Sequence, residues 1–589
     1  MDLVRTDVLI VGSGPAGAAA ALALATYGVS NMVVTKYSRL ADTPRAHITN
    51  QRTMEVLRDL GVEDEVVAKA TPQELMGNTV FCTSIAGEEL GRLRSWGNDP
   101  VRQAEHELAS PSRMCDMPQH LMEPVLINNA MDRGSVVRFD TEYLSMSQDD
   151  SGVTVTVRDR VRGDEYQIRA RYLIGADGGR SIVAEHAGLP MVGEMGVAGS
   201  INIVFHADLS EYVAHWPSVL YWVLQPGAEV GGIGMGLVRM VRPWNEWLIV
   251  WGYDINQPPP PLSDEYALSV VRTLIGDDDI PVRIQSSSAW TVNHMYARQL
   301  SSGRVFCAGD AVHRHPPSNG LGSNTSIQDS YNLAWKLKLV LDGKAGPELL
   351  DSYSAERAPV AEQVVERANR SIGETSRIFQ ALGLLSTEDT EQMRRNMAAR
   401  KDPSADAEKQ RAALREAIEY KVYEFNAHGV EMNQRYDSAA IIQDGTTDPG
   451  FDRDPELHHR PSSRPGAKLP HAWLSIGRRN VSTLDVAAQG RFTLLTGIGG
   501  EPWVDAAHEV SGRLGVDVVG VRIGPGCDYQ DPYGDWARVR EVSDAGCVLV
   551  RPDGYVCYRM PAGADDPASA VERALRSVLA LPVMHESER

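Results

Sequence analysis

The sequence predicts a protein that combines α/β and α+β architecture and ends in a smaller β/α domain. Three observations predict this. A strand, a glycine-rich turn, a helix and a second strand follow one another within residues 6–35, and strand-like runs dominate residues 197–290. A linker rich in Pro, Gly, Asp and Arg over residues 441–470 precedes a compact β/α pattern. The 589 residues leave room for three or four domains, at about 100–200 residues each.

The first unit has the order with which nucleotide-binding α/β domains begin. Residues 6–11 (TDVLIV) form a short apolar run that suits a buried parallel strand. GSGPAG (12–17) follows, and then an Ala-rich helical stretch that should stop at Gly28. SNMVVT (30–35) predicts the second strand.

GSGPAG matches the G-x-G-x-x-G pattern of dinucleotide-binding turns. In that pattern Gly12 makes the tight turn, Gly14 lets the backbone approach a pyrophosphate, and Gly17 allows close packing of helix and strand. With Pro15 and Ala16 they open a helix, whose free N–H groups and positive dipole end attract phosphate. A plain structural turn is the alternative, and the position between a strand and a helix favours the nucleotide site.

One residue expected of this pattern is missing. The acidic side chain that binds a ribose 2′-hydroxyl near the end of the second strand is replaced by Thr35 and Lys36. A cation at Lys36 suits a 2′-phosphate, so this motif alone leaves NADP open as its ligand. Lys36 is therefore a candidate cofactor-binding residue.

Composition excludes several classes of protein. Lys plus Arg number 58 and Asp plus Glu 78, and the formal net charge of −20 repels nucleic acid and anionic membrane surfaces. The six cysteines stand singly with no CxxC pair, which argues against a disulfide framework and fits a reducing cytoplasm. No apolar stretch reaches the ~18–20 residues of a membrane span. No metal site is expected, because His313 and His315 lack a carboxylate partner at a suitable spacing.

Two further segments combine with the glycine-rich turn. YLIGADGGRS (172–181) is a strand with a DG pair at Asp177, and residues 303–337 hold a strand with a GD pair at Asp310, a Pro/Gly loop and a long helix. A fingerprint, a DG segment and a GD segment in this order resemble the single-component FAD-dependent aromatic hydroxylases of the para-hydroxybenzoate hydroxylase type. PRAHITNQRTMEVLRDLG (44–61) and the GD segment with its helix resemble the phenol ortho-hydroxylases in particular.

The resemblance implies a Rossmann-like FAD domain interleaved with a β-sheet substrate domain and followed by a thioredoxin-like domain. The segments expected are FAD-domain parts at 1–75, 111–185 and 296–375, substrate-domain parts at 76–110 and 186–295, a helical segment and linker at 376–464, and the thioredoxin-like domain at 465–589. The last domain has no CxxC pair, so a thiol oxidoreductase is not expected. Its expected role is packing or subunit contact, and the resemblance implies a homodimer.

FAD is the cofactor that the three motifs imply, with NADPH or NADH as a transient reductant between which the sequence does not choose. Asp310 is placed to accept hydrogen bonds from ribityl or ribose hydroxyls, and Asp177 should line the nucleotide groove. The helix expected to begin near Ser326 points its positive end at the flavin. The resemblance extends cofactor contact to Arg45, Gln119, Pro317, Gly320, Leu321, Gly322 and Asn324.

The resemblance also implies that a phenol, with or without halogen, alkyl or aryl groups, is hydroxylated ortho to its hydroxyl group to give a catechol. Reduced flavin would react with O₂ to form a peroxide at its C4a carbon, and this electrophile needs an electron-rich ring. His47 is the candidate catalytic residue that hydrogen-bonds the phenol oxygen. Full proton transfer from a phenol (pKa ~10) to a free histidine (~6.5) is uphill by ~3.5 units, or ~4.8 kcal/mol. The alternative for His47 is a cap of the helix expected from about Asn50.

The substrate-domain sheet is expected to cover the ring of the substrate. By the resemblance its wall holds Trp222, Met235 and Arg242, with Pro316 facing them. The alternatives are ordinary core packing for Trp222 and Met235 and a surface ion pair for Arg242. Three other functions stay open at this point: an FAD-dependent dehydrogenase, a hydroxylase of larger polycyclic aromatics, and a flavin-binding scaffold without activity.

Overall fold

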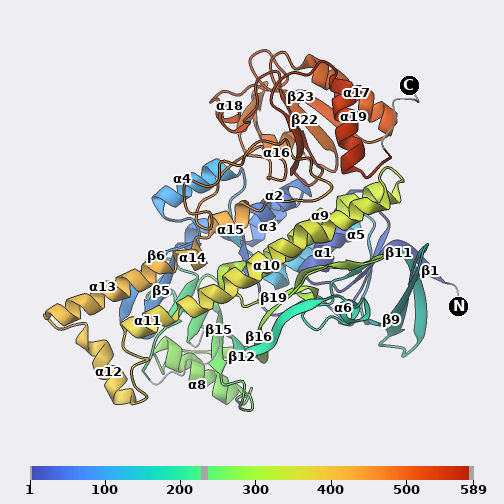
Figure 1. Ribbon diagram of the computed structural model, residues 1–589. Coiled ribbons are helices and arrows are strands. Elements are labelled where there is room, and N and C mark those ends of the chain that lie inside the picture. Colours follow the sequence, from blue (N-terminus) through green and yellow to red (C-terminus); the bar gives the residue numbers. More distant parts are fainter. Residues whose placement is uncertain (1–2, 227–235, 488, 583–589) are drawn as a thin grey trace.

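The computed structural model describes residues 3–226, 236–487 and 489–582. Within these residues the strands form two large sheets of eight strands each, a four-stranded sheet near the C-terminal end, and two small sheets. Figure 1 shows the long helices α9 (Gly322–Leu341) and α10 (Asp351–Glu374) crossing the middle of the molecule, with the C-terminal sheet and its helices beyond α9. The mixed α/β class predicted from the sequence is confirmed.

The first large sheet is parallel at its centre, as dinucleotide-binding sheets are. β1 (Val4–Val11) pairs in parallel with both β2 (Asn31–Val34) and β11 (Glu165–Gly175). The order of its main path is β17 (Ser301–Ser302), β18 (Val305–Cys307), β11, β1, β2 and β8 (Val136–Arg138), and β10 (Gly152–Asp159) and β9 (Thr141–Asp149) extend the sheet from β11.

The predicted strand–turn–helix unit has the expected form. α1 (Pro15–Thr26) starts directly after the glycine-rich turn, and Gly28, at φ +73°, follows its last turn. The helix is buried over most of its length, because its alanine side chains let α5 (Gln119–Asp132) and α9 pack closely against it. This packing holds the N-terminal end of α1 at the carboxyl end of β1.

The second large sheet is mostly antiparallel and contains the strands predicted over 197–290. Its order is β19 (His313–Arg314), β16 (Arg283–Ala297), β12 (Met191–His206), β15 (Glu246–Tyr253), β14 (Leu237–Arg242), β13 (Leu220–Val223), β5 (Asn78–Cys82) and β6 (Glu89–Arg94). Helix α8 (Asp264–Ile275) packs against it, and Ser263 caps this helix by accepting a hydrogen bond from the amide of Tyr266.

The chain passes repeatedly between the two large sheets. Strands of the first sheet lie within 4–34, 136–175 and 301–307, and those of the second within 78–94, 191–297 and 313–314. A small sheet of β3 (Ile48–Thr49), β7 (Cys115–Asp116) and β4 (Thr71–Pro72) lies in the connections. The shorter helices there are α2 (Gln51–Asp59), α3 (Glu63–Lys69), α4 (Pro100–Ala109), α6 (Ile182–His186) and α7 (Ser210–Val213).

The long helical stretch differs from the prediction at its start. The helix expected from about Ser326 begins at Gly322, because the 3₁₀ turn Ser318–Gly320 already brings Leu321 into helical conformation. The helical stretch is broken near Gly383 and Pro403, between α11 (Ser376–Ala381), α12 (Thr390–Ala399) and α13 (Ala405–Tyr420). Two short helices, α14 (Val422–Phe425) and α15 (His428–Met432), precede the linker.

The C-terminal part forms its own sheet and is joined to the rest by buried contacts. The sheet order is β23 (Val518–Arg522), β22 (Phe492–Thr496), β24 (Cys547–Val550) and β25 (Val556–Met560), and only β22 and β23 are parallel. The other elements are β20 (Trp473–Ile476), β21 (Arg479–Ser482), α16 (Thr483–Val486), α17 (Glu501–Leu514), α18 (Asp535–Val539) and α19 (Pro567–Val578). The ring of Trp335 on α9 meets that of Phe492 edge-on, with centroids 6.0 Å apart.

None of the helices in the described ranges has the length and apolar composition to cross a membrane. Nor do His, Cys, Asp and Glu residues gather there in an arrangement that could hold a metal ion.

Candidate active site

Two glycines of the first motif are packed against main-chain atoms, and the third has open space beside it. A Cβ built on Gly12 would lie 2.1 Å from the carbonyl oxygen of Ala176, and one built on Gly17 would lie 2.0 Å from that of Gly12. Neither position has room for a side chain. A Cβ on Gly14 would meet only Oε1 of Glu123, at 4.0 Å. The N-terminal end of α1 is therefore open to a ligand at Gly14, and this open face fits the pyrophosphate of FAD.

The three motifs meet around this opening. The residue that touches Gly12 directly precedes Asp177 of the DG segment. A Cβ on Gly309 of the GD segment would lie 2.9 Å from the Cβ of Ala16 and 2.8 Å from Oγ of Ser326. The fingerprint, both acidic segments and the first turns of α9 thus surround the N-terminal end of α1.

Gln119 and Arg45 lie beside the same opening. Glu123, next to Gly14, accepts hydrogen bonds from Nε2 of Gln119 (2.6 Å) and from the amide of Ala41 (2.8 Å). The amide of Gln119 in turn donates to the carbonyl of Arg45 (2.8 Å). Burial raises the pKa of Glu123. A carboxyl group that keeps its proton more readily repels a neighbouring pyrophosphate less.

The two predicted aspartates have different surroundings. Asp177 accepts hydrogen bonds from Oγ of Ser181 (2.5 Å) and from two amides at the start of α6 (2.8 and 3.2 Å), so it caps that helix. The carboxylate of Asp310 is exposed and has no hydrogen bond to any described residue, whereas its main-chain carbonyl accepts one from Nε of Arg314 (2.9 Å). Asp310 is therefore free to bind a ligand. Lys36 is exposed just beyond the end of β2.

Asn324 joins the loop before α9 to the loop that contains His47. Its amide nitrogen donates to the carbonyls of Ile48 (2.8 Å) and Gly320 (2.6 Å), and its Oδ1 accepts the amide of Asn50 (3.0 Å). Both of its amide hydrogens are thus used within the protein. The role that this shows for Asn324 is positioning of the two loops, and its predicted contact with FAD stays a prediction.

The other predicted residues of this loop differ in burial. Gly322 is open, since a Cβ there would meet only the ring of His315 at 3.6 Å. Pro316 is buried and its carbonyl lies 2.7 Å from Nδ1 of that histidine, while Pro317 is exposed. Leu321 points into the apolar core shared with the C-terminal part. Pro316, Pro317 and Gly322 therefore frame the open end of α9, and Leu321 anchors it.

His47 lies in a short chain of buried polar groups between the small sheet and the second large sheet. Its Nδ1 is 3.3 Å from Oδ1 of Asp116, and Oδ2 of Asp116 accepts a hydrogen bond from Nη2 of Arg239 (2.5 Å). Both ring nitrogens of His47 are buried and neither forms a hydrogen bond with a described residue, so the 3.3 Å approach to Asp116 is an ion-pair contact of Nδ1, whereas Nε2 has no such contact. The alternative role of His47 as the cap of α2 is wrong, because Asn50 caps this helix by accepting a hydrogen bond from the amide of Thr53 (3.0 Å).

Charge and burial set the proton affinities of this chain. Burial and the nearby charge of Arg239 lower the pKa of His47 to about 4, although Asp116 opposes the shift. Burial favours the neutral form of Asp116, yet Arg239 and His47 together hold the pKa of its carboxyl below the usual value. At neutral pH the group is therefore a neutral histidine beside a carboxylate–guanidinium pair, with an unpartnered ring nitrogen on one side.

Strand register places Trp222 on the same face of the sheet as Arg239. Arg239 pairs with Leu220 across β13 and β14, and Trp222 is two residues further along β13. Residues two apart on a strand share a face. The ring of Phe81 on β5 stacks against that of Trp222, with centroids 6.5 Å apart. Since Arg239 contacts Asp116, this face looks toward His47 and gives the site an aromatic wall.

The other predicted wall residues are placed differently. Arg242 lies at the end of β14 and donates to the carbonyl of Lys69 (2.6 Å), and its charge also lowers the pKa of Asp116. Its predicted place in the wall stays a prediction. Met235 lies outside the described residues. The wall continues instead in a buried apolar cluster that unites Ile48 and Trp222 with Phe425 of α14.

Sequence reasoning missed Asp116, Arg239 and Glu123. Arg239 has apolar neighbours on both sides within β14 (LVRMVR), and a charge in such a place must find a buried partner. That signal could have indicated a partner for Arg239, but not its identity, because Asp116 is 123 positions away. Glu123 sits within α5 as an ordinary helix residue, and nothing local separates it from other glutamates.

A nucleotide cradle at the carboxyl end of a parallel sheet, beside an aromatic wall and a buried histidine, defines a flavoprotein oxidoreductase. The family described as "FAD binding domain" matches residues 5–368, and "Aromatic-ring hydroxylase, C-terminal" matches residues 462–582. The chain belongs to the FAD-dependent aromatic-ring hydroxylases.

Individual relatives agree with this family. Over 98% of this chain and 99% of the relative, the sequence is 59% identical to 2,4-dichlorophenol 6-monooxygenase from Delftia acidovorans. Over 97% and 92%, it is 54% identical to phenol 2-monooxygenase from Pseudomonas sp. (strain EST1001). The crystal structure of the flavin-dependent monooxygenase PieE in complex with FAD and substrate superposes with a TM-score of 0.93 at 46% identity, covering 98% of this chain and 100% of that one.

Proposed function

We propose that this enzyme hydroxylates phenols ortho to the hydroxyl group, using FAD, O₂ and NADPH or NADH, and releases catechols. The names of the relatives support this substrate class. Those named for phenols are 54–59% identical to the chain, whereas those named for the tetracenomycins are 31–33% identical. Smaller phenols are therefore better supported as substrates than polycyclic aromatics.

The observation that carries the proposal is the unpartnered Nε2 of His47. This nitrogen is buried, has no hydrogen-bond partner among the described residues, and lies on a ring whose other nitrogen faces Asp116 at 3.3 Å. Asp116 favours the tautomer with the proton on Nδ1, which leaves Nε2 as an acceptor. A hydrogen-bond acceptor beside the aromatic wall suits the O–H group of a phenol, whose ring is apolar.

His47 accepts the hydrogen bond of the phenol in this mechanism, and Arg239 supplies the compensating charge. A pKa of about 4 for His47 makes complete transfer from a phenol of pKa ~10 uphill by ~6 units, or ~8 kcal/mol. This gap exceeds the ~3.5 units expected from an ordinary histidine. His47 therefore polarises the O–H bond, and the guanidinium of Arg239 stabilises the negative charge that develops on the oxygen.

When bound and reduced, FAD supplies the activated oxygen that is transferred to the ring. The chain's own contribution is to orient the ring and exclude water. Trp222 and Phe81 present flat apolar surfaces, and both are buried. Exclusion of water protects a reactive oxygen species from breakdown before it meets the substrate.

A series of phenols with different pKa values tests the proposal. Wild-type protein should consume NADPH or NADH faster when a phenol is present and should form the catechol. His47→Ala should retain FAD but lose kcat/KM most severely for phenols of high pKa, because those need the most help to ionise. His47→Gln, which keeps a hydrogen-bond acceptor, should lie between them.

Two results would contradict this account. Oxidation of NAD(P)H that no phenol stimulates would remove the proposed reaction. Equal loss of kcat/KM in His47→Ala across the whole series would keep the reaction but remove His47 from activation of the hydroxyl group.

We also propose that the C-terminal part is a thioredoxin-like domain without redox function. The order β23-β22-β24-β25, with β22 and β23 parallel and the other pairs antiparallel, supports this class. Cys547 and Cys557 are both buried with free thiols, and burial raises the pKa of each to about 12. Such thiols stay protonated and unreactive at neutral pH.

A further inference from the structure

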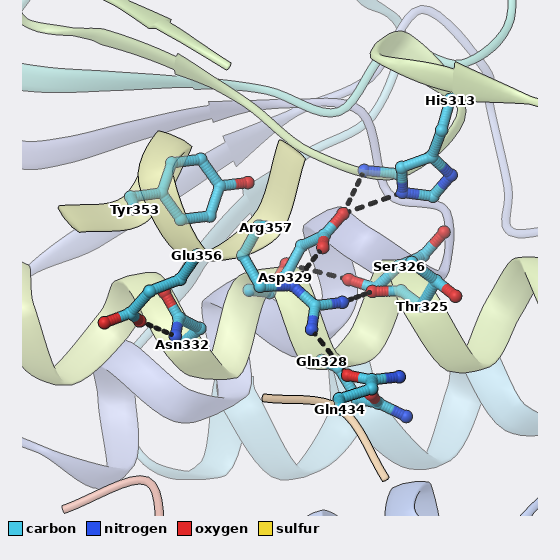
Figure 2. A network of polar contacts seen from close by, with 12 residues as sticks. His313, Thr325, Ser326, Gln328, Asp329, Asn332, Tyr353, Glu356, Arg357 and Gln434 are labelled. Atoms are coloured by element: carbon cyan, nitrogen blue, oxygen red, sulfur yellow. Dashed lines mark hydrogen bonds and ion pairs between the residues drawn. The ribbon is translucent and has the colours of Figure 1, made fainter. Parts of the chain in front are cut away.

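Asp329, in the third turn of α9, accepts hydrogen bonds from three donors, two in the GD segment and one on α10. Its Oδ2 accepts hydrogen bonds from the amide of Gly309 (3.1 Å) and from Nε2 of His313 (2.8 Å), and its Oδ1 accepts one from Nε of Arg357 (2.7 Å). Figure 2 shows Asp329 between His313 and Arg357. Asp329 and Arg357 are completely buried, so the arrangement cannot be a surface ion pair.

The first two donors belong to the GD segment. Gly309 immediately precedes Asp310, whose exposed carboxylate is the group available to the hydroxyls of FAD. Gly309 has φ +65° and packs against Ala16, so its peptide has one orientation. The carboxylate of Asp329 holds the Gly309 amide and the His313 ring from inside the core. It therefore fixes the direction in which the side chain of Asp310 points.

Arg357 extends the arrangement to the segment before the linker. Its Nη1 donates to Oε1 of Gln434 (3.0 Å) and to the hydroxyl of Tyr436 (3.1 Å), and its Nη2 donates to the carbonyl of Thr325 (3.3 Å). The guanidinium thus joins α10, α9 and the chain that leads to the C-terminal part.

We propose that Asp329 is a positioning residue for FAD: it acts through Gly309 and His313 on Asp310, and Arg357 holds it in place. Asparagine cannot replace it, because the amide NH₂ of Asn would face one of three N–H donors that need an acceptor. A buried donor left without an acceptor is costly, and the GD segment would shift to relieve it.

The test measures the dissociation constant of FAD by titrating apoprotein with FAD and following flavin fluorescence. Asp329→Asn should raise this constant by about tenfold or more, the equivalent of ~1.4 kcal/mol. Arg357→Lys keeps a positive charge but loses the guanidinium N–H groups that reach Gln434 and Tyr436. It should therefore raise the dissociation constant of FAD by a smaller factor of about three.

A matched control lies next to Arg357 on the same helix. The carboxylate of Glu356 accepts hydrogen bonds from Lys336 (2.8 Å) and Arg551 (2.6 Å) and faces the C-terminal part, away from the GD segment. Glu356→Gln breaks a buried ion pair of the same two helices, so it should lower Tm as Asp329→Asn does. Its FAD dissociation constant should stay within about twofold of wild type.

His313 provides a second, milder test that does not depend on Asp329→Asn folding. His313→Ala removes one donor to Asp329 and should weaken FAD binding by about fivefold, whereas His313→Gln keeps an N–H near the position of Nε2 and should restore it. An unchanged FAD dissociation constant in His313→Ala would overturn the proposal. So would Glu356→Gln weakening FAD binding as much as Asp329→Asn, because the effect would then be general loss of stability. Both measurements read FAD binding alone and are independent of the substrate.

Discussion

The positive charge of Arg239 lowers the proton affinity of His47, the proposed catalytic residue. It lies in the same buried group as Asp116 and His47, and its charge is a cause of the low pKa of His47. Replacing Arg239 by glutamine removes that charge, so the pKa of His47 should rise from about 4 toward its usual value. Nε2 would then carry a proton over part of the working range and could no longer accept one.

We therefore expect the acid limb of kcat/KM to move to higher pH in Arg239→Gln. Activity of the wild type should stay level as pH falls from about 7.5 to 6, while that of the variant should already decline. The variant should also lose stability by ~3–5 kcal/mol, because Asp116 is left buried without its cation. Arg239→Lys is the control, since it keeps the charge. Identical pH profiles for all three proteins would show that the charge does not act on His47.

The glycines of the fingerprint should respond differently to the same substitution. Gly14→Ala adds a methyl group in open space, 4.0 Å from Glu123, so the apoprotein should keep its Tm. The methyl group lies where the pyrophosphate approaches, and the FAD dissociation constant should rise at least about tenfold. Gly17→Ala places its Cβ 2.0 Å from the carbonyl of Gly12 and should prevent folding. Thermal unfolding and FAD titration separate the two outcomes, and a Gly14→Ala protein with normal FAD affinity would place the cofactor elsewhere.

At the scale of elements, α9 contacts both the loop that contains His47 and the GD segment. Its first turns carry Asn324, which holds the loop of His47, and Asp329, which holds the GD segment. A displacement of α9 would thus move the histidine and the flavin-binding loop together. One rigid helix therefore sets the distance between the two reaction partners, as catalysis by orientation requires.

Asn324→Ala tests the link between α9 and His47. The substitution leaves the amide of Asn50 and the carbonyl of Ile48 without partners, at ~1–3 kcal/mol for each buried group. Tm should fall, and the loosened His47 should let a larger share of NAD(P)H be consumed without catechol formation. The measurement is the ratio of catechol formed to NAD(P)H oxidised. If that ratio stays at the wild-type value while Tm falls, Asn324 serves stability alone.

Local patterns predicted the elements that hold the cofactor, because each depends on neighbours in the chain. The strand, turn and helix around Gly14 lie within one short stretch of the chain, residues 4–26. The ion pair of Asp116 and Arg239 joins residues 123 positions apart. Asp329 accepts hydrogen bonds from residues that precede α9 in the sequence and from one that follows it. Such pairs follow from tertiary packing, so a single sequence indicates at most that a buried charge needs a partner.

At the scale of the whole molecule, buried neutral histidines make stability depend on pH. Burial lowers the pKa of six histidines. It is about 4 for His47, His106, His315 and His471, and lies well below the usual value for His428 and His459. These residues bind protons in the unfolded chain below about pH 6.5 but not in the folded one. The free energy of unfolding should therefore fall as pH decreases from about 6.5 toward 4.

Two buried acids act in the opposite sense. Burial raises the pKa of Glu431 to about 8 and that of Asp59 to about 6, so the folded protein keeps protons there that the unfolded chain has lost. Near pH 5.5 the six histidines outweigh the two acids by about four protons, which corresponds to a loss on the order of 5 kcal/mol per pH unit. Paired carboxylates, such as Asp116, add to this loss only at lower pH.

His106→Phe isolates one histidine of this set that does not belong to the buried group of His47, Asp116 and Arg239. The ring of His106 stacks on that of His428 with centroids 3.8 Å apart, and neither of its nitrogens has a partner among the described residues. Phenylalanine keeps the stacking and removes the titration, so the loss of stability per pH unit should be about a quarter smaller in the variant than in the wild type, a difference of ~1.4 kcal/mol. Urea unfolding at several pH values between 7 and 5.5 measures both slopes. Parallel slopes for the two proteins would mean that acid sensitivity arises from the carboxylates, since removal of a buried neutral histidine must otherwise flatten the dependence.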